Sequence, residues 1–177
     1  MTSRQVTSRT ADRELRLLYE SAFPENEKIP WKYLLRLIEP IHLDFTAYRD
    51  QGRFVGFTIV YPRPSFNWLW YFAVEEQLRG QGYGGQILAC LKERYQGQNC
   101  VLDMESPRQE DCDNLLQRKR RYDFYLRNGF RGTDVYRWYG DTEMTIMMTG
   151  KGGFTMQDWD GIVNDLRQSW MQIFHKG

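Results

Sequence analysis

The sequence predicts an α+β protein with a mixed, mostly antiparallel central sheet and helices on both of its faces, in three layers. Two observations support this prediction. The predicted strands come mostly as hairpins, so only strands separated by a helix need be parallel. The chain has 177 residues, 41% hydrophobic and 27% charged, which is enough for one globular core and too few for two. We therefore interpret residues 1–177 as a single domain.

The first half of the chain predicts two helices and three strands. Residues 11–23 place apolar side chains at i, i+3, i+4 and i+7, and residues 30–40 repeat this helical spacing between two prolines. Alternating residues on both sides of a short glycine-containing turn predict a β-hairpin over 43–62. The segment "NWLWYFAV" at 67–74 is apolar on both faces, which is typical of a strand buried between layers.

The middle of the chain adds a helix, a strand and a second, longer helix. Apolar residues at 87–95 have helical spacing, and "CVLDME" at 100–105 has the character of a strand. Ser106 can cap a helix whose first turn contains a proline, so we expect a polar helix from 106 to about 128. Gly129 suits the left-handed position that follows it.

The last elements are a hairpin and a helix. Residues 133–148 alternate on either side of Gly140 and Asp141, which predicts the hairpin turn. A capping pair of Thr155 and Asp158 then opens a final amphipathic helix that extends to about residue 174.

Composition excludes several classes of protein. A net charge of +1 gives no nucleic-acid or membrane footprint, and no run approaches the roughly 18 apolar residues of a spanning helix. Cys90, Cys100 and Cys112 form no C-x-x-C, and the first residues lack an apolar signal segment, so we expect a cytoplasmic protein without disulfides. His42 and His175 have no metal-ligand spacing, so we expect no metal.

The glycine-rich stretch "EEQLRGQGYGGQIL" at 75–88 indicates a phosphate site. Its glycines fit G-x-G-x-x-G, and acids follow roughly 20 residues on, which would suit a dinucleotide. However, five residues separate the strand end near Val74 from Gly80, and the sheet opens with a hairpin, which is poor context for a doubly wound fold. No Lys-Ser or Lys-Thr follows, so a Walker loop fails as well.

A loop that enters a helix N-terminus nevertheless suits a pyrophosphate, because free backbone N–H groups and the helix dipole favour an anion. Gly80, Gly82 and Gly84 would let the backbone approach it, and Arg79 could add a charge-assisted contact. The alternative is a flexible surface turn before a helix.

Two segments resemble the GNAT superfamily of N-acetyltransferases. "FAVEEQLRGQGYGGQIL" resembles that family's acetyl-CoA loop, whose pattern of Gln or Arg, two residues, Gly, one residue, then Gly or Ala is met from Gln77 onward. "YDFYLRNGF" at 122–130 resembles a later family segment in which Phe-Tyr near a helix end is followed by Gly-Phe. Both segments occur in the family's order, and the predicted element order agrees along most of the chain.

The resemblance implies an acetyl-CoA-dependent N-acetyltransferase of GNAT-like fold that works by direct attack in a ternary complex. It implies that Tyr125 protonates the departing CoA thiolate and that the strand before the loop pairs with the pantetheine arm. The implied cofactor-binding residues are Phe72, Ala73 and Val74 for the pantetheine, and Arg79, Gly80, Gln81, Gly82, Tyr83, Gly84 and Gly85 for the pyrophosphate.

Two further features are the candidate general base and a run of basic residues. The family often supplies a carboxylate from the strand before the loop, but 67–74 contains none, so Glu105 is the candidate base, directly or through water. Its alternative is a solvated acid ahead of Ser106. "RKRR" at 118–121 is interpreted as a mostly solvated helix face, except that Arg121 lies one turn before Tyr125 and could reach CoA. The family commonly has Asn and Ala where this chain has Arg118 and Arg121.

The acceptor is expected to be a small-molecule amine rather than a protein, walled by the two opening helices and the second hairpin. An aminoglycoside-like compound, a peptide N-terminus and a lysine stay open, as does a homodimer. No cysteine is placed to require an acyl-enzyme. The alternative function is a non-catalytic acyl-CoA-binding or sensor protein of the same fold.

Overall fold

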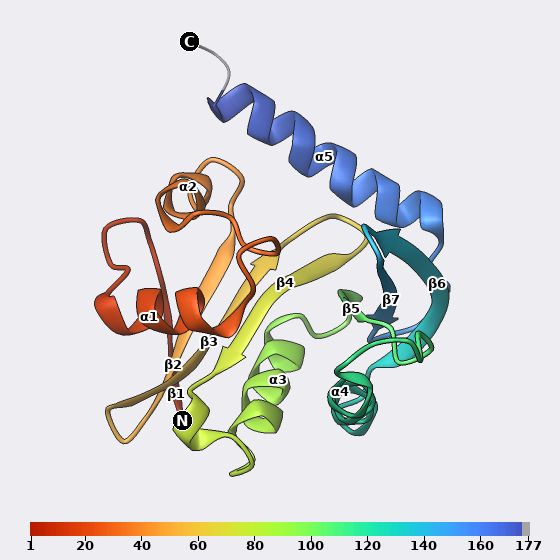
Figure 1. The fold of residues 1–177 in the computed structure, drawn as a ribbon. Helices are drawn as coiled ribbons and strands as arrows, with labels where there is room; N and C mark the ends of the chain where they lie inside the picture. Colours follow the sequence, from red (N-terminus) through yellow and green to blue (C-terminus); the bar gives the residue numbers. More distant parts are fainter. Residues whose placement is uncertain (175–177) are drawn as a thin grey trace.

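The structure is a computed structural model that describes residues 1–174, so His175 lies outside the described residues. Its centre is a seven-stranded sheet with the order β1-β2-β3-β4-β5-β7-β6 (Figure 1). All neighbouring strands are antiparallel except β4 and β5. In chain order the elements are β1 (Thr2–Gln5), α1 (Arg13–Ala22), α2 (Trp31–Leu37), β2 (Asp44–Asp50), β3 (Arg53–Tyr61), β4 (Asn67–Val74), α3 (Tyr83–Arg94), β5 (Cys100–Glu105), α4 (Leu115–Arg127), β6 (Arg131–Tyr139), β7 (Thr142–Met148) and α5 (Met156–Phe174).

The expected α+β class and both hairpins are confirmed, but two local predictions fail. Strand β1 was not predicted, because its four residues are polar and exposed and its backbone pairs with β2, which is distant in the sequence. The helix expected from 106 begins only at Leu115. The Ser106 N–H donates to the Glu143 carbonyl at 2.7 Å and the Ser106 hydroxyl accepts from Arg108 N–H at 3.2 Å, so this residue extends the pairing with β7 and opens only a turn.

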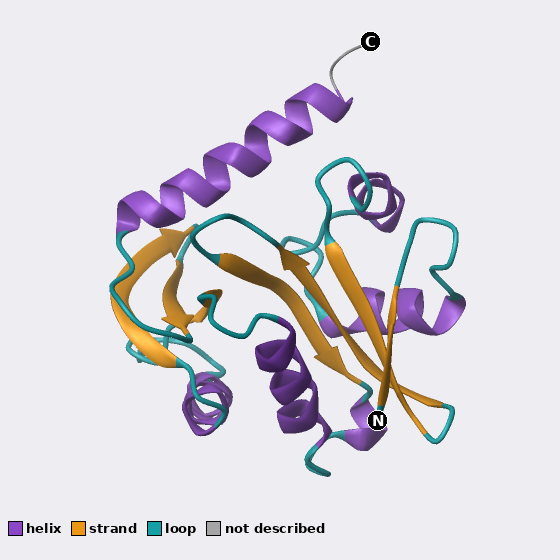
Figure 2. Cartoon of the chain, turned by 180° about the vertical axis from the view of Figure 1, so that it is seen from behind, coloured by secondary structure: helices purple, strands orange, loops and turns teal. Residues whose placement is uncertain are grey.

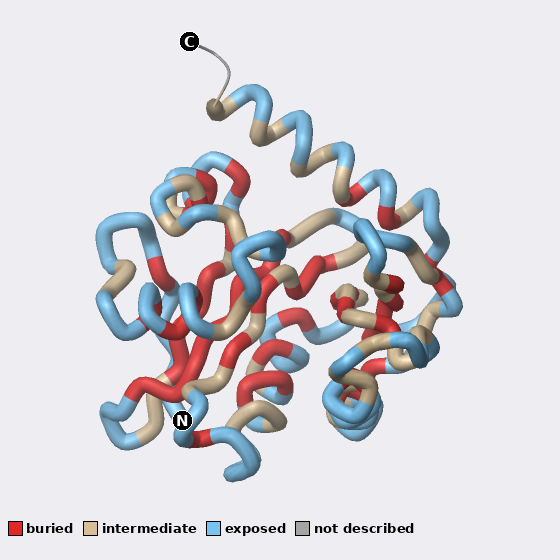
Figure 3. The backbone as a smooth tube through the Cα atoms, in the orientation of Figure 1, coloured by how far each residue is buried: buried red, intermediate tan, exposed pale blue. Residues whose placement is uncertain are grey.

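Helices cover both faces of the sheet. One large core cluster joins the sheet to α1, α2 and α5, and two smaller clusters join its other face to α3 and α4. Figure 2 shows α3 and α4 as neighbours beneath the sheet, and Figure 3 shows that burial is concentrated in the strands between the layers. We call these the α1/α2/α5 face and the α3/α4 face.

Strands β4 and β5 separate soon after they begin. Only Asn67 and Trp68 of β4 pair with β5, at Cys100 and Val101, and the two strands then diverge (Figure 1). A register shift between Ile59 and Val60 of β3 marks a bulge at this point of the sheet. From Leu69 onward, no strand of the described part of the chain pairs with the β5-side edge of β4.

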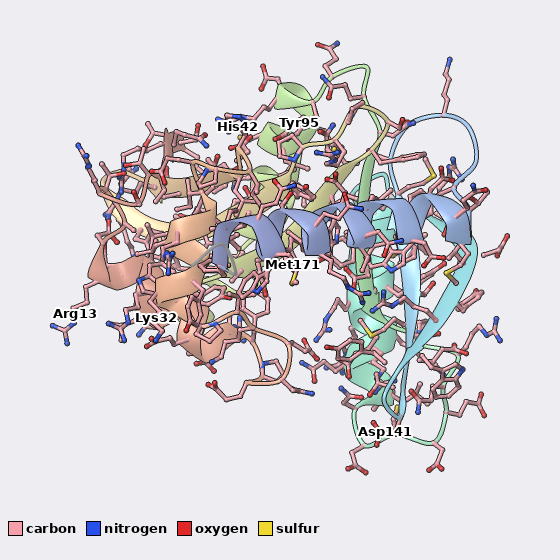
Figure 4. All side chains as sticks on the ribbon, turned by 90° about the horizontal axis from the view of Figure 1, so that it is seen from above. Arg13, Lys32, His42, Tyr95, Asp141 and Met171 are labelled. Carbon is pink, nitrogen blue, oxygen red and sulfur yellow. The ribbon has the colours of Figure 1, made fainter. Side chains whose placement is uncertain are left out.

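Helix α5 crosses the molecule from the β6–β7 half to α2, as the view from above shows (Figure 4). The predicted capping pair is confirmed, because Thr155 and Asp158 exchange side-chain to backbone hydrogen bonds of 2.8 and 3.2 Å. At its far end, Trp170 and Phe174 pack on Tyr33 with ring centroids 5.9 and 5.3 Å apart. None of the described helices combines the length and apolar character needed to cross a membrane.

Candidate active site

The glycine-rich loop presents a row of free backbone donors. After β4 a single 3₁₀ turn, Glu76–Leu78, buries Leu78 and returns the chain to the start of α3. Gly80 and Gly82 have φ of 77° and 84°, in the left-handed region that favours glycine. Within the described residues, no acceptor bonds the backbone N–H groups of Gly80, Gly82, Tyr83, Gly84 and Gly85. This arrangement can hold an anion at the positive end of α3.

Two side chains of the loop point back to the sheet. Arg79 Nε donates to the Val74 carbonyl at 3.3 Å, so its guanidinium lies over the end of β4. The Tyr83 hydroxyl donates to Asp50 at 2.9 Å, in the β2–β3 hairpin. Of the predicted loop residues, Tyr83 thus offers its backbone rather than its side chain to the anion position.

Gly84 and Gly85 have a packing role that the sequence did not indicate. A Cβ at Gly84 would lie 3.1 Å from the Phe124 ring, and one at Gly85 would lie 3.1 Å from Asn128 Oδ1. The Phe124 ring also stacks on Phe72, with centroids 6.3 Å apart. These two glycines therefore allow α3 and α4 to approach each other where the strands separate.

Tyr125 lies between the two halves of the sheet, near the end of α4. A Schellman motif fixes that end, because Phe130 N–H bonds to the Tyr125 carbonyl and Gly129 N–H to that of Leu126. The Tyr125 side chain is buried between the rings of Phe124 and Phe130. Its hydroxyl has no hydrogen-bond partner among residues 1–174, although it is not sealed from solvent.

Burial raises the pKa of Tyr125 to about 12, while the charge of Arg121 lowers it and that of Asp103 raises it. The hydroxyl therefore stays protonated at neutral pH and has no competing bond. It is available as a proton donor to a group that enters the gap between β4 and β5.

Glu105 is the centre of an ion-pair network. One oxygen lies 3.0 Å from Arg118 and the other 3.3 Å from Arg121, and the Asn114 amide donates to both at 3.1 Å. Arg118 is only 4% exposed, so the interpretation of the whole basic run as a solvated face is wrong at this position. Its guanidinium also bonds Gln109, and this set of contacts holds the loop before α4 against β5.

Asp103 is a site residue that the sequence pointed to only through the rejected dinucleotide pattern. It lies two residues before Glu105, so both carboxylates project from β5 to the α1/α2/α5 face. Its one side-chain partner in the described residues is Trp68 Nε1, at 3.0 Å from Asp103 Oδ1. Burial raises the pKa of Asp103, against the Trp68 hydrogen bond and the charge of Arg137, which lower it. Alternation along the strand was the signal that could have paired it with Glu105.

The loop between α1 and α2 brings a third carboxylate to this place. The Tyr71 hydroxyl donates to the Glu27 carbonyl at 3.0 Å and accepts from Ile29 N–H at 3.3 Å, which anchors the loop on β4. The Glu27 side chain reaches solvent, but partial burial of its carboxyl, then the charge of Glu105, raises its pKa. The loop between the two opening helices therefore lies close to the carboxylates of β5, while its role as a wall of the acceptor site stays a prediction.

Within residues 1–174, no group of three or more His, Cys, Asp or Glu side chains could hold a metal ion. Cys90, Cys100 and Cys112 are all free thiols. Burial raises the pKa of Cys100 to about 11, so its thiol stays protonated and unreactive at neutral pH.

Comparison with known proteins identifies the family to which the chain belongs. A family model described as an acetyltransferase (GNAT) domain matches residues 42–132, which include the glycine-rich loop and Tyr125. The fold is similar to that of a GNAT-family protein from Bacteroides thetaiotaomicron, with 25% identity, coverage of 95% of this chain and 97% of that one, and a TM-score of 0.76. A search of the curated proteins gave no match.

Two more distant structures share the fold. A GNAT family acetyltransferase from Elizabethkingia anophelis with acetyl-CoA bound is 18% identical, covers 85% of this chain and 97% of its own, and has a TM-score of 0.57. The ribosomal-protein-S18-alanine N-acetyltransferase from Escherichia coli is 15% identical, with coverage of 88% and 97% and a TM-score of 0.58. With a family model that spans just over half of the chain and a fold that agrees, the protein belongs to the GNAT family of acetyltransferases.

Proposed function

We propose that residues 1–177 form one N-acetyltransferase domain that transfers the acetyl group of acetyl-CoA to a primary amine by direct attack in a ternary complex. The observation that carries this proposal is the combination of five unpaired N–H groups, from Gly80 to Gly85, with the partnerless edge of β4. The first suits a pyrophosphate, and the second suits an extended amide chain such as pantetheine. The acetyl-CoA bound by the Elizabethkingia anophelis protein supports the same cosubstrate.

In this proposal the backbone of Phe72, Ala73 and Val74 pairs with the pantetheine arm. The Arg79 guanidinium, already at the end of β4, turns toward the diphosphate, and Arg121 lies on the other side of the gap. The thioester would then lie between β4 and β5, within reach of Tyr125.

The chemistry needs one acid and one base. The amine nitrogen attacks the thioester carbonyl, the C–N bond forms, and the C–S bond breaks as Tyr125 gives its proton to the leaving sulfur. The amine proton passes to a carboxylate. Acid assistance of this kind contributes about 10²- to 10⁴-fold to the rate.

Two carboxylates compete for the role of base. Glu105, expected from the sequence, already accepts from Arg118, Arg121 and Asn114, which occupies both of its oxygens. Asp103 accepts one side-chain bond, and burial raises its pKa and so its basicity. We therefore propose Asp103 as the base and Glu105 as the residue that positions Arg121, with Glu105 acting through water as the alternative.

Ligand screening tests the cosubstrate. Acetyl-CoA or CoA at about 100 times its dissociation constant should stabilise the protein by about 2.7 kcal/mol in a thermal-shift assay, whereas NAD and FAD should not. Release of CoA with a panel of primary amines then tests turnover. Stabilisation by NAD alone would reject the proposal, and tight CoA binding without any turnover would favour the non-catalytic alternative.

A further inference from the structure

Arg137 lies on the same face of the sheet as the two carboxylates of β5. In the strand register Glu105 is opposite Met144 of β7, and Met144 is opposite Arg137 of β6. Directly paired residues project to the same side of a sheet, so these three side chains form one row across the β6–β7 half. Asp103 lies beside this row on β5. Arg137 therefore faces the same side of the sheet as Asp103, the proposed base.

Among the described residues, the Arg137 guanidinium lacks the carboxylate partner that several other arginines have. Arg108, Arg118 and Arg121 each pair with a carboxylate. Arg137 has neither an ion pair nor a hydrogen-bond acceptor in residues 1–174, and its buried Nε is unbonded. An arginine whose donors are left unbonded is unfavourable unless a ligand or water completes it.

Aromatic rings hold this guanidinium in place. Its Cζ lies 4.9 Å from the centre of the Trp159 ring and 5.6 Å from that of Tyr139. Trp159 is 2% exposed, and its own indole N–H is a second buried donor for which residues 1–174 provide no acceptor. The Nε–H of Arg137 on β6 and the indole N–H of Trp159 on α5 are thus two unsatisfied donors on side chains that contact each other. An oxygen anion is an acceptor that suits such donors.

A chain of contacts joins this place to the proposed reaction centre. Trp159 packs edge-on against Trp68 at 5.2 Å, and Trp68 donates to Asp103 at 3.0 Å. The charge of Arg137 lowers the pKa of Asp103, and the charge of Asp103 raises the pKa of Tyr125. Asp103 is therefore linked through Trp68 and Trp159 to the ring on which Arg137 stacks.

We infer that Arg137 binds a carboxylate of the acceptor, so that the amine substrate is an amino acid or a related amine that carries a carboxylate group. This inference rests on the proposed N-acetyltransferase function and names its substrate class. The guanidinium offers a planar pair of donors to the carboxylate, and Asp103 takes the amine end. A bound carboxylate accounts for the unbonded N–H groups in the described residues better than a purely structural cation–π contact, which would leave these groups unsatisfied.

Matched acceptors test the inference. Proteinogenic L-amino acids are compared in CoA release, each beside its carboxamide and its decarboxylated amine. A charge-assisted bidentate contact predicts a kcat/KM about 10- to 100-fold higher for the best amino acid than for its two analogues that lack the carboxylate. Arg137→Met should abolish this preference by raising KM for the acid, while kcat/KM for the analogues stays within about twofold.

The control is Arg36→Met, because Arg36 lies 4.6 Å over the Phe174 ring at the other end of α5. This variant also loses a cation–π contact on α5 but should keep the acceptor preference. A second measurement, titration of the CoA complex with N-acetyl-L-amino acids, does not depend on turnover. Wild-type protein should bind an N-acetyl amino acid at least about tenfold more tightly than Arg137→Met does.

Three results would overturn the inference. They are equal kcat/KM for acid and amide in the wild-type protein, an equal loss for both in Arg137→Met, and no difference between the two proteins in binding N-acetyl amino acids. Failure of acetyl-CoA to bind would instead reject the proposed function. Equal turnover of amines with and without a carboxylate would leave that function intact and reject the role of Arg137.

Discussion

Replacing Tyr125 with phenylalanine removes the proposed acid and little else. The hydroxyl has no hydrogen-bond partner among the described residues, so its loss leaves no buried group unsatisfied. The ring contacts with Phe124 and Phe130 are kept. We expect the free energy of unfolding to change by less than about 0.5 kcal/mol and kcat to fall by about 10²-fold.

The pH dependence of Tyr125 follows from its burial. Its pKa is raised from 10.0 to about 12, and the protonated form is the active one, so the tyrosine should not limit the rate up to about pH 10. A group whose pKa is higher in the folded state contributes stability that is complete below the unfolded pKa. This contribution is lost as the pH rises from 10 to about 12, and the phenylalanine variant should lack that loss.

The assay is CoA release at saturating acetyl-CoA, together with calorimetric binding of CoA and urea denaturation. Tyr122→Phe is the matched control, since Tyr122 lies on the same helix and should keep full activity. If Tyr125→Phe keeps more than about a third of kcat, or loses activity only because CoA binding is lost, Tyr125 is not the general acid.

Three further predictions concern the loop and the carboxylates. In Gly82→Ala the new Cβ meets no atom within 4 Å, but the left-handed φ of 84° is unfavourable for alanine. The substitution should therefore cost about 1–2 kcal/mol of loop stability and weaken CoA binding. Gly161→Ala in α5 should leave CoA affinity unchanged in the same titration. Arg118→Met removes the buried partner of Glu105 and should lower the free energy of unfolding, measured by urea denaturation, by about 3 kcal/mol. Arg120→Met, at an exposed position, is the control, and an equal loss of stability in the two variants would contradict this prediction. Asp103→Asn should raise the urea midpoint at pH 7 and lower kcat/KM. Burial raises the pKa of the Asp103 carboxyl, so its charged form costs stability above that pKa. Unchanged activity would return the role of base to Glu105.

The difference between Glu105 and Asp103 shows where inference from sequence ended. Both acids were visible, and alternation along β5 places them on one face. Their chemistry depends on partners far away in the chain. Arg118 is 13 residues from Glu105, and Trp68 is 35 residues from Asp103. The strand order and the start of α4 place two arginines beside Glu105 and the Trp68 indole beside Asp103.

Features that depend on neighbouring residues could be predicted from the sequence. These are the helical spacings, the hairpin turns, the Thr155–Asp158 cap, the left-handed Gly129 and the glycine-rich loop at a helix N-terminus. The separation of β4 from β5, the late start of α4, and the contacts of Arg137 with Trp159 and Tyr139 could not be predicted, because they depend on packing. Backbone propensity and capping act within a few residues, whereas burial, strand register and ion pairing join segments that are distant in the sequence.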